Sequence, residues 1–164
     1  FFSLEMSEQE LVDRMLSGHY REPLYNIMKA RMTDQRFEQI AKLDGIDSLG
    51  FWIDDSASMT IDNIRAKTRY MKLKHGITLI VIDYLGIISS TGKTQNREQE
   101  IARLSRQCKM IAKESEVTVM LLSQLNRESE KRPNHEPMLA DLRDSGAIEQ
   151  DANIVCFPFR AENN

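Results

Sequence analysis

The sequence is poor in the residues that mark secreted, disulfide-rich and membrane-spanning proteins. It has only 2 cysteines, 4 prolines, 7 glycines and 1 tryptophan in 164 residues. Cys108 and Cys156 have no CxxC or Cys/His spacing, so neither a disulfide framework nor a zinc site is predicted, and we expect two buried, reduced thiols. No apolar run approaches the roughly 20 residues of a membrane-spanning helix. We therefore expect a cytoplasmic protein without membrane contacts.

The chain also lacks an overall positive charge. Its formal net charge of −3 at pH 7 argues against a globally basic nucleic-acid binder. Basic residues are instead concentrated between Lys93 and Lys113, where they outnumber acids. Both a solvated helix face and a contact with nucleic acid explain such a stretch, and the charge pattern leaves both open.

The order of the apolar patterns is that of an α/β domain. The expected strands are 1–5, 51–54, 79–83, 117–125 and 153–157. The expected helices are 34–43, 97–114 and 141–151, with two more that begin after the capping residues Ser7 and Thr60. Runs that are apolar on both sides are typical of parallel strands with both faces covered, so we predict a mostly parallel sheet flanked by helices.

Three of the expected strands end in a polar residue. Glu5 ends the first, Asp83 ends LIVID, and Gln124 ends VTVMLLSQ. Because ligands of α/β sheets bind beyond the carboxyl ends of parallel strands, we expect these three side chains to converge on one edge. One acid at such an edge can bind Mg²⁺, and a second acid can act as a general base. An amide can hydrogen-bond a phosphate. Taken alone, an acid after a strand is more often a turn former, a helix cap or a solvated end.

A set of motifs carries a family resemblance. The segments FFSLEM, LIVIDYL, NREQEI, SQLNR and DLRDSGAIEQDANIV, in this order and spacing, resemble the ATPase domain of DnaB-type hexameric replicative helicases. The resemblance extends from Phe1 to about Arg160. It implies a RecA-like fold and a parent enzyme that couples ATP hydrolysis with Mg²⁺ to 5′–3′ translocation on single-stranded DNA and duplex unwinding. It also implies a homo-hexamer at the replication fork, with a primase and a helicase loader as partners.

The resemblance gives roles to the residues at the strand ends. Glu5 would be the general base that polarises the attacking water, and Asp83 would be the Walker B acid that binds Mg²⁺. Gln124 would sense the γ-phosphate and couple hydrolysis to movement of the DNA-binding loops.

The same resemblance places Arg143, Asp144 and Gly146 in a loop that lines the central channel and holds DNA phosphates. An arginine pairs well with a phosphate, and a glycine lets the backbone approach it. The family commonly has Glu where Asp144 stands. Lys93 and Arg97 belong to a second expected channel loop. The simpler reading of these segments is helix capping and solvated side chains.

The phosphate-binding loop GxxxxGK[ST] is absent from the sequence. The stretch TGKT at 91–94 lacks the first glycine and follows Asp83, so we interpret it as a chance match. In the family, this loop lies just before the strand that bears Glu5, and the arginine finger lies beyond the position of Asn164. We therefore expect residues 1–164 to be a partial RecA-like domain that alone neither binds ATP tightly nor hydrolyses it.

Other functions share parts of this pattern. A recombinase or clock-type RecA-like ATPase would have the strand-end acids but not SQLNR together with DLRDSGAIEQDA. A non-catalytic module that joins a helicase ring or its loader would explain the missing loop, but it has no need for the polar strand ends. A phosphoryl receiver domain would use Asp54 and Asp55 as an acidic pair, but no lysine ends a later strand. We expect those two residues to serve in turns and caps.

Overall fold

A parallel three-stranded sheet forms the centre of the computed structural model, which describes residues 1–42, 48–88, 97–126, 132 and 136–159. The strand order is β1 (Phe2–Ser3), β2 (Leu79–Asp83), β3 (Thr118–Leu121). The helices are α1 (Glu8–Tyr20), α2 (Leu24–Met28), α3 (Asp34–Ala41), α4 (Ile61–His75), α5 (Arg97–Ser115) and α6 (Gly146–Asp151), with 3₁₀ turns η1 (Leu85–Ile87) and η3 (Leu139–Ser145). The predicted parallel sheet flanked by helices is confirmed.

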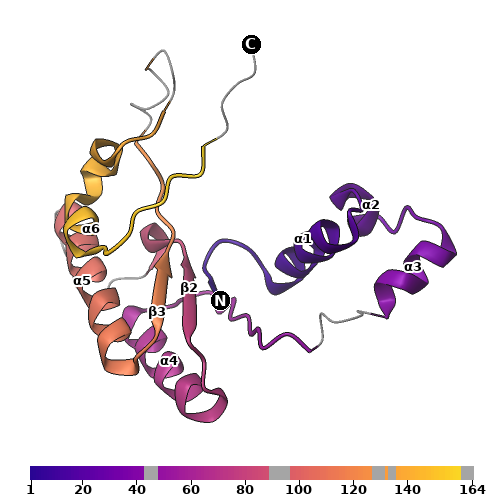
Figure 1. Cartoon of the computed structure of the whole chain (residues 1–164), viewed down its shortest axis with the longest axis horizontal. Helices are drawn as coiled ribbons and strands as arrows, with labels where there is room; N and C mark the ends of the chain where they lie inside the picture. The colour runs from indigo at the N-terminus through magenta and orange to yellow at the C-terminus, as the bar shows by residue number, and fades with distance from the viewer. Residues whose placement is uncertain (43–47, 89–96, 127–131, 133–135, 160–164) are drawn as a thin grey trace.

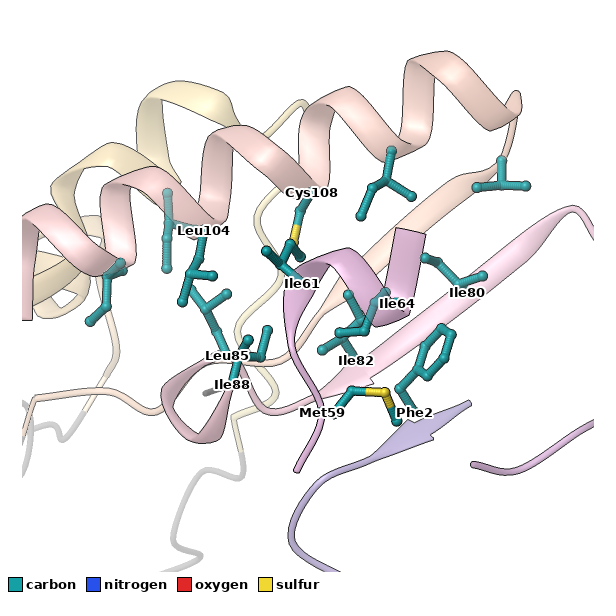
Figure 2. Packing of buried hydrophobic residues seen from close by; sticks show 14 residues of the cluster. Phe2, Met59, Ile61, Ile64, Ile80, Ile82, Leu85, Ile88, Leu104 and Cys108 are labelled. Atoms are coloured by element: carbon teal, nitrogen blue, oxygen red, sulfur yellow. The ribbon is translucent and has the colours of Figure 1, made fainter. Parts of the chain in front are cut away.

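The hydrophobic core lies between one face of the sheet and the helices α4, α5 and α6 (Figure 1). Ile64 of α4, Ile82 of β2 and Leu104 of α5 are each 0% exposed. Figure 2 shows their side chains pointing into the space shared by these three elements. Because removal of apolar surface from water is the main force in folding, this cluster fixes the strand that ends at Asp83.

The opposite face of the sheet is open in the part of the chain that the structure describes. Leu79 on β2 is 47% exposed and Met120 on β3 is 53% exposed, whereas Ile80 on the helix-facing side is 3% exposed. The expectation of strands buried on both faces is therefore wrong for the outer face. The apolar composition of a strand indicates that it can be buried on both faces. Whether a helix or a loop covers each face depends on other parts of the fold.

Local capping signals in the sequence are realised in the structure. Ser7 caps α1 in a capping box with Glu10, as predicted, and Thr60 caps α4 through the backbone N–H of Asn63. At the other end of α4, Gly76 adopts φ +66°, a left-handed conformation that glycine reaches without strain. These devices set both ends of the helix that packs beside β2.

Two expected strands are not formed. Residues 51–54 make only an isolated parallel bridge, between Phe2 and Asp54. Residues 152–159, all of them described, contain no strand, and Ile154 there is 82% exposed. A strand needs a partner for its backbone, and apolar composition does not supply one. For the same reason Cys156 is exposed instead of buried as expected, while Cys108 is buried as predicted.

The first three helices extend away from the sheet (Figure 1). The backbone N–H of Glu8, at the start of α1, donates to Oδ2 of Asp55 at 2.9 Å, which ties this arm to the segment before α4. None of the helices in the described residues is long and apolar enough to cross a membrane.

Candidate functional site

The carboxyl edge of the sheet brings together the three segments that bear Glu5, Asp83 and Gln124. Ser3 of β1 is in register with Asp83 of β2, and Ile82 is in register with Leu121 of β3. Glu5 and Gln124 follow the ends of β1 and β3, so all three residues lie at one edge, as the sequence predicts. Because β2 is the central strand, Asp83 lies between the other two segments.

Backbone hydrogen bonds fix Asp83 from both neighbouring strands. Its carbonyl oxygen accepts from Leu4 N–H at 2.8 Å, on the β1 side. On the β3 side, Leu122 N–H donates to the oxygen of Ile82 at 3.0 Å, and Leu85 N–H donates to the oxygen of Leu122 at 3.2 Å. These hydrogen bonds hold the half-buried acid at a strand end that is fixed on both sides. The Asp83–Tyr84 peptide bond is cis.

Glu5 lies in a short turn between β1 and α1. The buried Ser3 hydroxyl donates to the carbonyl oxygen of Met6 at 2.5 Å and so closes this turn. Directly after it, Ser7 caps α1, with its backbone N–H 2.9 Å from the Glu10 carboxylate. The turn therefore has a fixed backbone on both sides, while the Glu5 side chain is exposed to solvent at the sheet edge.

The donor set at this edge fits one Mg²⁺ bound together with a nucleotide. Among the described residues no group of three or more His, Cys, Asp and Glu could hold a metal ion by itself. Magnesium is usually held by one or two carboxylates, with water and substrate phosphates completing the shell. Asp83 supplies a carboxylate of this kind, whereas a loop that would cradle the phosphates is absent from the sequence.

The acidic pair Asp54 and Asp55 has a structural role. The Asp54 carboxylate pairs with Lys67 and accepts from the Ser56 hydroxyl at 2.5 Å. Burial alone would raise the pKa of Asp54, but the hydrogen bonds from Lys67 and Ser56 outweigh it, so the pKa lies below its ordinary value. Asp55 accepts from the first turn of α1, as described above. The predicted turn and cap roles are confirmed, and a role as the acidic pair of a receiver domain is not supported.

Only part of the expected DNA-binding set can be placed. Arg143 and Asp144 lie in η3, Gly146 begins α6, and Arg97 begins α5, but their side chains are outside the described part of the structure. Lys93 lies outside the described residues altogether. Farther along α5, Arg103 and Arg106 are exposed, as on a solvated helix face.

An ion pair that the sequence does not reveal lies near these segments. The guanidinium of Arg132 pairs with the carboxylate of Asp141, and the Asp141 side chain is only 2% exposed. The sequence assigns no role to Arg132, and helix capping is the alternative that it leaves open for Asp141. Two residues that are nine positions apart in an aperiodic loop give no pattern from which a pair can be predicted.

Comparison of the fold with solved structures defines the class of the domain. A solved ATPase domain superposes with a TM-score of 0.90 at 34% identity, over 97% of this chain and 58% of that one. A DnaB-like replicative helicase, solved in a study of its interactions with primase, gives a TM-score of 0.85 at 33% identity, over 92% of this chain and 37% of that one. The chain is thus a RecA-like α/β domain.

Sequence comparison then gives the family. A model of the DnaB-like helicase C terminal domain matches residues 1–164, and the chain belongs to this family. The replicative DNA helicase DnaB of Mycobacterium intracellulare is 44% identical over 155 residues, which are 94% of this chain and 27% of that protein. The DnaB of Geobacillus stearothermophilus is 43% identical over 161 residues, which are 97% of this chain and 36% of that protein. The chain spans about a third of the length of these relatives.

Proposed function

We propose that this chain is part of the motor domain of a replicative DNA helicase. The parent protein would couple Mg²⁺-dependent ATP hydrolysis to 5′–3′ movement on single-stranded DNA and to unwinding of the duplex. The observation that carries this proposal is the placement of Glu5, Asp83 and Gln124 on one sheet edge, in a chain of the DnaB-like helicase family.

Each of the three residues at the sheet edge would have a different role in ATP hydrolysis. Glu5 would accept a proton from the attacking water, because its exposed carboxylate lies in a turn with a fixed backbone. Asp83 would hold Mg²⁺ from the rigid central strand. When bound, the metal neutralises the negative charge of the phosphates. Gln124 would hydrogen-bond the γ-phosphate without adding negative charge.

The DNA contacts are proposed for two segments. Arg143, with the backbone near Asp144 and Gly146, would bind phosphates of the single strand, because a guanidinium and close backbone N–H groups suit phosphate oxygens. Lys93 and Arg97 would form a second contact. The ring would be a homo-hexamer in the cytoplasm at replication forks. Primase and a loader would be its partners, and the solved relative with primase supports the first of these.

The candidate with a different function is a non-catalytic RecA-like module that joins a helicase ring or its loader. Its motive is the absence of a GxxxxGK[ST] motif from these 164 residues, which would favour such a module only if the chain were complete. Such a module would assemble with helicase subunits but would hydrolyse no ATP in any context.

A chimera separates the two functions. Residues 1–164 replace the matching segment of the Geobacillus stearothermophilus helicase, which supplies the remaining parts of the protein. The helicase proposal predicts a ring that unwinds a forked duplex with ATP and Mg²⁺. A ring that assembles yet neither hydrolyses ATP nor unwinds DNA would support the non-catalytic module and refute the helicase proposal.

A further inference from the structure

Asp141 is a buried acid with several hydrogen-bond partners, close to the expected DNA-binding segment. Its carboxylate pairs with the Arg132 guanidinium and accepts from the backbone N–H of Met138 at 2.8 Å. Its own N–H donates to the oxygen of Met138 at 2.9 Å. A carboxylate that is 2% exposed is stable only when such partners satisfy it, so its position is fixed by several groups at once.

Asp141 also joins two segments that are separate in the sequence. Its carbonyl oxygen accepts from Asn126 N–H at 2.9 Å, and Asn126 lies just after Gln124 at the exit from β3. Arg132 extends the connection, because its guanidinium also donates to the oxygen of Glu136 at 2.8 Å. The side chain and the backbone of one residue thus hold the loop between β3 and η3 at both of its ends.

The residues after Asp141 lead directly into the expected DNA contacts. Leu142, the next residue, is 5% exposed, and η3 packs against α5 and α6. Arg143 follows at once. Asp141 and Leu142 are therefore the anchored start of the segment 143–146, and the link to Asn126 relates this start to the segment that bears Gln124.

We propose that Asp141, held by Arg132, is a positioning residue that keeps the DNA-binding segment 143–146 in a fixed relation to Gln124 at the sheet edge. This inference rests on the proposed helicase function and adds a residue to it. Binding of DNA at 143–146 would then change the rate of hydrolysis at the nucleotide site through Asp141 and Asn126. Hydrogen bonding from Arg132 lowers the pKa of Asp141 below its ordinary value, so the carboxylate is charged at neutral pH.

The test uses the full-length helicase that carries this chain, with Asp141→Asn and Arg132→Gln as the variants that break the ion pair. Glu149→Gln, which changes an exposed acid on the adjacent α6, is the matched control. ATP hydrolysis is measured without DNA and with saturating single-stranded DNA, and thermal unfolding is measured for each protein. A purely structural role would lower the unfolding temperature and both hydrolysis rates together.

We expect the ratio of the two rates to separate the variants. In Asp141→Asn and Arg132→Gln, hydrolysis without DNA stays within about twofold of the unsubstituted protein, and the stimulation by DNA falls about fivefold or more. Arg132→Lys, which keeps the charge, retains more of the stimulation than Arg132→Gln. Glu149→Gln behaves like the unsubstituted protein.

Three outcomes would overturn the inference. One is full DNA stimulation in both variants that lack the ion pair. Another is an equal loss of hydrolysis with and without DNA. The last is failure of both variants to fold. Each of these two results would mean that the Arg132–Asp141 pair has a purely structural role. If the unsubstituted protein itself shows no DNA-stimulated hydrolysis, the proposed function fails first, and that result is distinct from the other three.

Discussion

Truncation of Leu104 on α5 tests whether the core described here holds the sheet in place. Leu104 is 0% exposed and lies in the cluster between α5 and β2 (Figure 2). Leu104→Ala removes about three methylene-sized groups at about 0.8 kcal/mol each, which gives about 2.4 kcal/mol. The cavity that remains adds to this loss, so we expect the free energy of unfolding to fall by about 3–4 kcal/mol.

Leu73→Ala on α4 is the matched control, because Leu73 is 80% exposed. Both substitutions replace leucine by alanine within a helix, so the change in helix propensity is the same and the difference reports burial. We expect Leu73→Ala to change the free energy of unfolding by less than about 0.5 kcal/mol. Urea unfolding of the 164-residue chain, followed by circular dichroism, measures both. Equal effects of the two substitutions would refute the packing described here.

Three further predictions concern a cap, the thiols and an ion pair. Thr60→Ala removes the cap of α4, so urea unfolding should show a loss of about 1 kcal/mol, and Thr60→Ser should restore most of it. Burial raises the pKa of Cys108 to about 12, so a thiol reagent at pH 8 should label Cys156 alone, and mass spectrometry that finds Cys108 labelled in the folded chain would contradict its burial. Asp54→Asn should lower the unfolding temperature at pH 7, because it removes the ionised partner of Lys67. The folded pKa of Asp54 lies below its ordinary 3.8, so this contribution is present above that value and is lost as the pH falls through the folded pKa. The unfolding temperatures of the two proteins should therefore become equal in acid. A difference in unfolding temperature that persists at about pH 2 would exclude the ion pair as its cause.

Signals that act over a few residues could be predicted from the sequence. The Ser7 capping box depends on one hydroxyl and on one carboxylate three positions later, and this spacing can be read from the sequence. The position of Asp83 follows from an apolar run that ends in an acid, because the carboxyl ends of parallel strands share one edge. The shared edge of the three strand ends was therefore predicted correctly, while the site and the roles of its residues stay predictions.

Features that depend on distant partners could not be predicted. Residues 153–157 have the composition of a strand, but nothing in their own sequence tells whether a neighbouring strand is there to pair with them. The open outer face of β2 and β3 has the same origin, because alternation along a strand does not say what covers each side. The Arg132–Asp141 pair joins a residue of the connection after β3 to a residue of η3, and no periodicity relates one to the other.

The most direct test of the sheet-edge site is the rate of Mg²⁺-dependent ATP hydrolysis in the chimera with the Geobacillus stearothermophilus helicase, with and without Asp83→Asn. Asp62→Asn, a change of an exposed acid in the first turn of α4, is the control. We predict that Asp83→Asn lowers the rate by about 100-fold or more, since it removes the charge that holds the metal, while Asp62→Asn leaves the rate within about twofold. A chimera that hydrolyses ATP equally well with Asp83→Asn would contradict the assignment of Asp83, and with it the nucleotide site proposed at this edge of the sheet.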